Sequence, residues 1–137
     1  MILIVCLDDG GGMQFNHRRQ SRDRVLNAHL LQMAQQTALW MNPTTAKLFA
    51  GQTAPQIRVD EEFLQKTGPG EYCFLEDGPA LPVLDRVERV VACRWNRDYP
   101  RDRVFDVDLT DGSWQLESSQ ELVGSSHEKI TVEVYTR

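Results

Sequence analysis

The chain has 137 residues, of which 41% are hydrophobic and 26% are charged, with a formal net charge of −5. This length predicts a single domain spanning residues 1–137, and the composition excludes global disorder. No apolar run approaches the roughly 20 residues that a membrane helix needs. An acidic chain is also a poor general nucleic-acid binder, because neutralising phosphates supplies most of that affinity. We expect neither a membrane nor a nucleic acid as partner.

The start of the chain and its cysteines favour a reducing compartment. The apolar run over residues 2–7 is too short for a signal peptide and leads directly into two aspartates. Cys6, Cys73 and Cys93 lie in apolar stretches without Cys-x-x-Cys spacing, which predicts buried, reduced thiols in a cytoplasmic protein. The three histidines have no metal-ligand spacing, so we expect no metal site.

The predicted elements alternate between strands and short helices over most of the chain. The apolar runs predict strands at residues 2–7, 38–41, 56–59, 71–75 and 87–95. Helices are expected at residues 25–33, 43–49, 60–67 and 79–84, with Ser21 as N-cap of the first helix and Asn42 as N-cap of the second. Residues 104–109 and 130–135 alternate with period two, which predicts a late antiparallel pair. The fold class is therefore α/β, a mixed, mostly parallel sheet flanked by helices.

A basic segment stands out against the acidic total. Residues 1–50 carry five Lys or Arg against three Asp or Glu, whereas residues 51–137 carry ten against seventeen. In His17–Arg24, five of eight residues are basic or His, and this segment precedes a predicted helix N-terminus. Arg18, Arg19 and Arg22 are therefore candidate ligands of phosphate or carboxylate. The alternative is a solvated basic face that pairs with the acidic second half.

Other segments could complete a site at the same sheet edge. The glycines after Asp8-Asp9 lack dinucleotide-binding and phosphate-loop spacing, and are expected to form a loop, or a mobile lid over a cleft at the end of the first strand. Asp23 is either a helix-dipole or capping partner, or it binds a ligand's heterocycle edge or relays a proton. Asn42, Thr44 and Thr45 offer a neutral phosphate cradle, although capping alone explains most of this motif.

A serine–histidine pair near the end of the chain is a weaker candidate. Ser125 and Ser126 precede His127, which suggests a nucleophile and a base. Adjacent residues on an extended chain point apart, so we do not expect a hydrolase triad from this motif.

Taken together, these segments resemble the dihydrofolate reductase family. Residues 2–9 resemble its first strand, and residues 12–23 resemble its mobile loop and first helix start, which places Asp23 at the acidic position that contacts the pterin. Residues 39–45 resemble the strand and helix start that bind the cofactor phosphates. Further similar segments are residues 72–77, 87–95, 101–105, Trp114 and 126–137. The resemblance implies this fold over nearly the whole chain, and implies NADPH and a pterin as ligands.

Departures from the family argue against hydride transfer. Glu76-Asp77 replaces the Gly-Gly pair beside the nicotinamide, and Asn42-Pro43 replaces a Gly-Arg clamp. Cys93 replaces the threonine that supports the pterin carboxylate, and the arginine-rich segment replaces the loop's Pro-Trp. Because the nicotinamide lacks these supports, NADPH is disfavoured as cofactor, although it stays possible.

Three functions follow from these observations. The first is a small-ligand-binding protein that binds a nucleotide- or pterin-like anion without transferring hydride, through Arg18, Arg19, Arg22, Asp23 and the segment 42–45. The second is an NADPH-dependent reductase of a dihydrofolate- or pyrimidine-type substrate, with Asp23 as catalytic proton relay. The third is a protein–protein interaction module, with a second copy of the chain in a homo-oligomer as one partner, that uses its charge asymmetry or the edge of the C-terminal strand.

Overall fold

The computed structural model describes residues 1–137, and its centre is the apolar N-terminal strand β1 (Ile2–Leu7). Successive side chains of a strand point to opposite faces. Leu3 and Val5 accordingly enter one core cluster, whereas Ile2 and Ile4 enter a second cluster on the other face. The core therefore has two layers, one on each side of the sheet.

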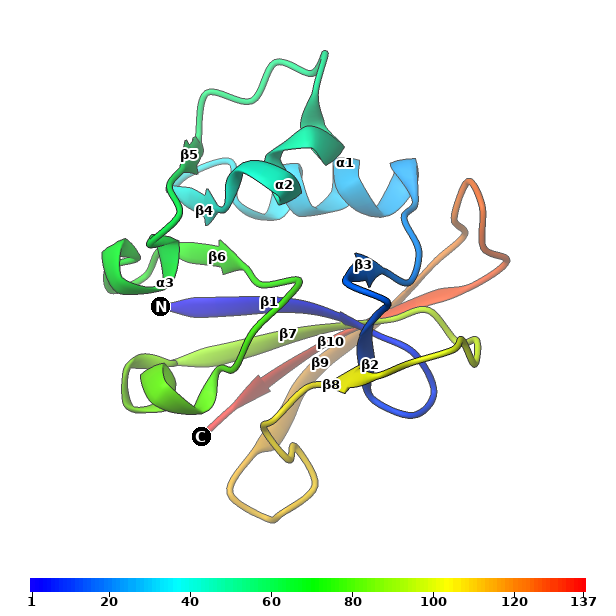
Figure 1. Ribbon diagram of the computed structural model, residues 1–137. Helices are drawn as coiled ribbons and strands as arrows, with labels where there is room; N and C mark the ends of the chain where they lie inside the picture. Colours follow the sequence, from blue (N-terminus) through cyan, green and yellow to red (C-terminus); the bar gives the residue numbers. More distant parts are fainter.

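The main sheet has seven strands in the order β5-β4-β6-β1-β7-β10-β9. The bounds of the strands other than β1 are β4 (Leu39–Met41), β5 (Ile57–Val59), β6 (Tyr72–Phe74), β7 (Arg89–Arg94), β9 (Gln115–Leu122) and β10 (Ile130–Thr136). The five strands from β5 to β7 are parallel, and β10 pairs antiparallel with both β7 and β9. The prediction of a mixed, mostly parallel sheet is confirmed, and Figure 1 shows β4, β6 and β1 running to the same end.

Helices cover both faces of this sheet. Helix α1 (Arg24–Met33) buries Leu26 and Leu30 in the cluster that contains Ile2 and Ile4. The remaining helical segments are short: α2 (Pro43–Ala46), η1 (Lys47–Phe49), α3 (Phe63–Lys66) and η2 (Leu81–Arg86). Figure 1 shows α1 and α2 on one side of the sheet and η2 on the other. The predicted cap Asn42 is confirmed, since its Oδ1 accepts a hydrogen bond from the Thr45 amide at 2.8 Å.

The sequence predicted Ser21 as the N-cap of α1, but the structure shows that the N-cap is Asp23. Asp23 has extended backbone angles, and its carboxylate accepts hydrogen bonds from the amides of Val25 and Leu26 at 2.9 and 3.3 Å. Both residues are good N-caps by type, so sequence could not decide between them. The shift by two residues leaves the Ser21 hydroxyl free to make other contacts.

The glycine-rich segment forms the expected turn at Asp9 and Gly10, and it leads at Gly12 into a β-hairpin that the sequence did not predict. Strand β2 (Gly12–Phe15) pairs with β3 (Arg18–Arg19) on one side and with β8 (Arg103–Val104) on the other, in a second, three-stranded sheet. The Asp8 carboxylate closes the turn before β2 by accepting from the amides of Gly10 and Gly12 at 3.0 and 2.7 Å. A strand of four residues that contains glycine has too little periodicity to be recognised in the sequence.

The antiparallel pair at the C-terminal end was only half predicted. Strand β10 is where we expected it, but its partner is β9, and of residues 104–109 only Val104 is in a strand. Seven of the eight β9 side chains are exposed, and the strand contains no apolar alternation that sequence reasoning could detect. Because β10 pairs on both sides, its edge is not available to a partner, which corrects that expectation.

The three thiols are free, as expected. Cys73 and Cys93 are buried, whereas Cys6 is only half-buried. Burial raises the pKa of the Cys73 thiol to about 12, so this thiol is unreactive near neutrality. No helix of the structure has the length and apolar character needed to cross a bilayer.

Candidate functional site

A polar cavity of about 800 Å³ lies at the end of the main sheet where its parallel strands finish. None of its twelve lining residues is hydrophobic; they are Gln14, His17, Arg18, Arg19, Ser21, Arg22, Asn42, Thr44, Thr45, Glu76, Asp77 and Ser126. Asn42 directly follows β4, and Glu76 follows β6 by two residues. Ligands of open α/β sheets bind at this edge, and the volume suits a small organic molecule.

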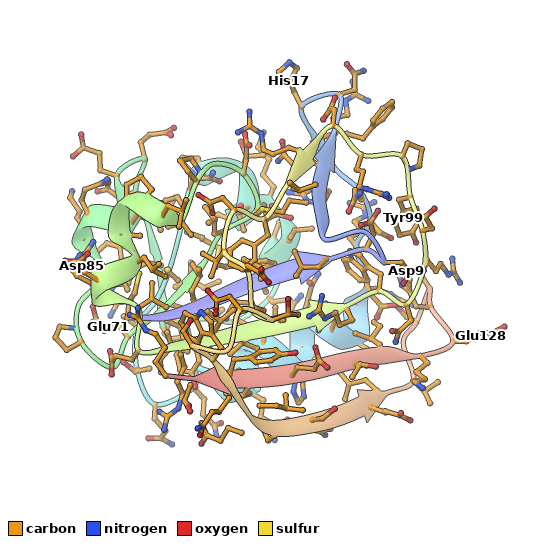
Figure 2. The ribbon with its side chains drawn as sticks, turned by 90° about the horizontal axis from the view of Figure 1, so that it is seen from below. Asp9, His17, Glu71, Asp85, Tyr99 and Glu128 are labelled. Atoms are coloured by element: carbon orange, nitrogen blue, oxygen red, sulfur yellow. The ribbon has the colours of Figure 1, made fainter.

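The β2–β3 hairpin forms one wall of the cavity. Its two turn residues, Asn16 and His17, both have positive φ angles, 53° and 61°, as a tight two-residue hairpin turn requires. Residues other than glycine rarely adopt this conformation, so the turn holds some backbone strain. Figure 2 shows His17 at the projecting tip, at the opposite end of the molecule from Glu71 and Asp85.

The three predicted arginines all line the cavity, but their partners differ. Arg19 donates to the Glu76 carboxylate through two nitrogens, at 2.8 and 2.9 Å, in a partly buried pair. Arg18 and Arg22 are exposed and have no hydrogen bond or ion pair from their guanidinium groups. Arg19 is thus bound to the fold, and the other two guanidinium groups are free to bind an anion.

Glu76 joins three parts of the chain at the floor of the cavity. Besides Arg19, its carboxylate accepts a hydrogen bond from the Thr45 hydroxyl at 2.8 Å. Asp77 is more exposed and forms an ion pair with Arg103 at 2.9 Å. Both carboxylates line the cavity where the resemblance places the nicotinamide, and each has a cationic partner in the structure.

Two of the three side chains in the neutral phosphate cradle predicted at residues 42–45 form hydrogen bonds within the protein. The Asn42 amide oxygen caps α2, and the Thr45 hydroxyl is buried against Glu76. The Thr44 side chain is exposed in the cavity and has no internal hydrogen bond. The Thr44 hydroxyl and the Nδ2 amide group of Asn42 therefore remain as unused donors for a ligand.

Asp23 is the one predicted site residue that does not line the cavity. It is 1% exposed, and its carboxylate accepts five hydrogen bonds: the two cap bonds, two from the amides of Ser125 and Ser126 at 3.0 and 2.8 Å, and one from His127. Burial alone would raise the pKa of Asp23, but the hydrogen bonds from His127 and from these amides outweigh it and hold the pKa well below its usual range. Asp23 is therefore an ionised structural carboxylate with its acceptor capacity filled.

His127 connects this buried carboxylate to the cavity. Its Nδ1 lies 2.9 Å from Asp23 Oδ2, and its Nε2 lies 3.0 Å from both Ser21 Oγ and the Tyr99 hydroxyl. The imidazole stacks on Trp95 with ring centroids 4.6 Å apart, and only 3% of the residue is exposed. Ser21, by contrast, lines the cavity.

Asp8 fixes the loops around this histidine. Its buried carboxylate accepts from the Tyr99 amide at 3.2 Å and from Gln20 Nε2 at 3.0 Å, and it lies 3.4 Å from Arg101. Figure 2 shows Tyr99 in the loop that follows β7, near the start of the hairpin. Asp8 therefore ties the chain beside Ser21 to the loop that carries the Tyr99 hydroxyl.

The structure brings together six of the seven predicted site residues, all but Asp23. Sequence reasoning missed Gln14 and Ser126 as lining residues, and it treated Ser21 as a helix cap rather than a ligand-site residue. It also missed the contact between Ser21 and His127, which are 106 positions apart. The structure contains no group of three or more His, Cys, Asp or Glu side chains arranged to hold a metal ion.

Comparison of the whole structure with solved structures gives a clear match. Over 99% of this chain and 95% of the other, it superimposes on dihydrofolate reductase from Enterococcus faecalis complexed with NADP(H) and RAB-propyl, with a TM-score of 0.66. The fold is that of dihydrofolate reductase. The resemblance seen in the sequence is thereby confirmed at the level of fold.

The likeness to dihydrofolate reductase does not extend to the sequence. Only 9% of the aligned residues are identical. No family model matches the chain, and no curated protein matches it by sequence. The function must therefore be argued from this chain's own side chains, because one fold supports many activities.

Proposed function

We propose that this protein binds a small anionic ligand, of the size of a nucleotide, in the cavity beneath the β2–β3 hairpin, and does not transfer hydride. One observation carries the proposal: Arg18 and Arg22 present guanidinium groups without internal partners to a cavity that has no hydrophobic lining. Guanidinium groups bind phosphate and carboxylate through paired hydrogen bonds. The exposed hydroxyls of Thr44 and Ser126 supply neutral donors beside them.

The position of Asp23 supports a phosphate or carboxylate group rather than a pterin edge as the main recognition element. A pterin-binding carboxylate needs free acceptor positions facing the ligand, whereas that of Asp23 accepts five hydrogen bonds from the protein. The residues fit an NADPH-dependent reductase poorly for the same reason. Glu76 and Asp77 also occupy the place of the family's Gly-Gly pair, with side chains that line the cavity.

Thermal unfolding in the presence of candidate ligands tests the proposal. The panel is inorganic phosphate, pyrophosphate, mononucleotides, folate and NADPH. A ligand that binds only the folded state adds about 2.7 kcal/mol of stability at a hundredfold excess over its dissociation constant, so the midpoint rises. We expect pyrophosphate or a mononucleotide to raise it.

The matched variants are Arg18→Ala with Arg22→Ala, and Arg24→Ala as control. Arg24 has the same charge, lies in the same segment and is outside the cavity lining. The double variant should weaken binding by about tenfold or more, which corresponds to 1.4 kcal/mol, and the control should bind as the wild type does. Equal binding by all three proteins, or no shift with any anion, would overturn the proposal.

NADPH oxidation with dihydrofolate addresses the reductase alternative. We expect none above background. Turnover that is lost in Asp23→Asn, in a variant that remains folded, would establish the reductase and displace the proposal.

A further inference from the structure

A buried carboxylate, an imidazole and a cavity-facing hydroxyl form a chain of hydrogen bonds at the edge of the polar cavity. The distances are 2.9 Å from Asp23 Oδ2 to His127 Nδ1, and 3.0 Å from His127 Nε2 to Ser21 Oγ. These lie in the range seen for a nucleophile, its general base and the group that orients the base. The members come from the segment before α1 and from the loop between β9 and β10.

The surroundings fix the proton positions in this chain. The buried Asp23 carboxylate accepts a hydrogen bond from His127 Nδ1–H, and in this tautomer the Nε2 lone pair faces Ser21 Oγ. The Trp95 ring stacked on the imidazole at 4.6 Å fixes its orientation. Among the three groups, Ser21 alone lines the cavity, which exposes the nucleophile and shields the base.

We propose that Ser21 is a nucleophile activated by His127, with Asp23 as the positioning residue, and that the protein hydrolyses small esters or thioesters. We further expect the acyl group of the substrate to carry a negative charge, because Arg18 and Arg22 line the same cavity as Ser21. This part of the inference rests on the proposed function. The nucleophile itself does not depend on anion binding. The two parts can therefore fail separately.

The reaction balances with water as the only co-reactant. Ser21 Oγ attacks the carbonyl carbon while His127 Nε2 accepts the hydroxyl proton, and a tetrahedral adduct forms. The bond from carbon to the leaving oxygen or sulfur breaks as His127 returns the proton to that atom, which leaves an acyl-Ser21 ester. Water then attacks this ester with His127 again as base, and the carboxylic acid and free Ser21 are released.

Tyr99 is the second hydroxyl on this histidine. It lies 3.0 Å from His127 Nε2 and 3.4 Å from Ser21 Oγ. Because it contacts the same nitrogen, Tyr99 keeps the imidazole in place while Ser21 is acylated, and we assign it as a positioning residue. A purely structural role for these four side chains is the competing explanation, and the experiment is designed to separate the two.

Covalent labelling by a short-chain alkyl fluorophosphonate tests the nucleophile directly. An activated serine displaces fluoride and retains the phosphonyl group, which intact mass and peptide mapping detect. We expect a single adduct on Ser21, absent in Ser21→Ala and unchanged in the control Ser119→Ala, which alters an exposed serine of β9. Without its base, His127→Gln should react about 100-fold more slowly or worse.

Labelling of the wild type in guanidinium chloride keeps the test decisive if His127→Gln does not fold. Activation depends on the folded arrangement, so Ser21 must lose its reactivity on unfolding. No adduct on the folded wild type, an adduct on Ser125 or Ser126 instead, or equal Ser21 labelling in folded and unfolded protein would overturn the proposal.

The positioning roles have spectroscopic and kinetic readouts. In the wild type, the nitrogen-15 spectrum of the His127 ring should show the Nδ1–H tautomer, and Asp23→Asn should lose this preference. Tyr99→Phe should slow the labelling of Ser21 while leaving the tautomer intact. A wild-type ring protonated at Nε2 alone, or labelling unaffected in both variants, would contradict the assignment.

The substrate class is tested with two p-nitrophenyl esters, the neutral acetate and the negatively charged hemisuccinate. We expect kcat/KM to favour the hemisuccinate by about tenfold or more, and this ratio should fall in the Arg18→Ala, Arg22→Ala double variant but not in Arg24→Ala. Labelling of Ser21 without any preference for the anionic ester would refute the anion site and leave the nucleophile standing. An anion-dependent midpoint shift without labelling would refute the nucleophile and leave the anion site standing.

Discussion

The segment from His17 to Arg24 contains two kinds of charged residue, and the difference between them separates stability from binding. Asp23 is buried, with its carboxylate filled by five donors, whereas Arg18 and Arg22 are exposed and have no partner. A buried ion that accepts its full set of hydrogen bonds stabilises the fold, and its loss leaves donors unpaired. An exposed guanidinium contributes little to folding and keeps its donors for a ligand. The charged residue with the most hydrogen bonds in this segment, Asp23, is therefore the one least available to a ligand.

The largest expected effect comes from Asp23→Asn. The amide removes the charge and places N–H donors against the amides of Ser125 and Ser126 and the His127 ring. Breaking one partner of a buried ionic network costs about 3–5 kcal/mol. Chemical denaturation should show a fall in the free energy of unfolding within this range. A fall below about 1 kcal/mol would mean that Asp23 does not anchor the loop before β10.

The same carboxylate predicts a second, smaller effect under acid. Because the pKa of Asp23 is lowered in the folded state, its contribution is fully present above its unfolded pKa of about 3.9 and is lost as pH falls through the folded value. The difference in unfolding free energy between wild type and Asp23→Asn should therefore shrink between pH 7 and pH 3, by about 1.4 kcal/mol for each pH unit below the unfolded pKa. A difference that stays constant would place the carboxylate's pKa at its ordinary value.

Glu76→Gln tests whether a paired arginine becomes available to a ligand when its internal partner loses its charge. Glu76 is the internal anion of Arg19, and removing its charge weakens a paired hydrogen bond worth about 1.5–3 kcal/mol. The variant should be less stable, yet it should bind pyrophosphate more tightly, because the Arg19 guanidinium becomes available as well. Titration calorimetry of wild type and variant measures both affinities. Weaker binding by the variant would show that Glu76 serves the ligand and not only the fold.

The sequence predicted the fold well because the fold depends on apolar patterns. The run over β1 and the periodicity of α1 are readable directly, and the boundaries of β7 and β10 follow from similar patterns. The prediction failed at β2 and β9. Strand β2 has only four residues, one of them glycine, and β9 is an exposed, mostly polar edge strand, so neither shows an apolar pattern. Pairing with neighbours, rather than local preference, makes these two segments strands.

The site was harder to predict because hydrogen-bond partners are not visible in a single sequence. The sequence gives no reason to distinguish Arg18, Arg19 and Arg22. In the structure Arg19 differs from the other two because it pairs with the Glu76 carboxylate, which is 57 positions away in the chain. Asp23 was a candidate for either a cap or a ligand contact, and the loop at Ser125 and Ser126 decides in favour of the cap. Ser21 was hidden for the same reason, since its partner His127 comes from the other end of the chain.

The most direct test of the anion site is a titration of nitrogen-15-labelled protein with pyrophosphate, monitored through the backbone amide spectrum. An anion site at the unpaired arginines predicts saturable shifts at the residues from His17 to Arg22 and at Thr44, with little change in strand β9, none of whose residues lines the cavity. The Arg18→Ala, Arg22→Ala double variant should lose these shifts. Shifts that are absent, or that gather away from this cavity, would contradict the claim that the unpaired arginines form an anion site.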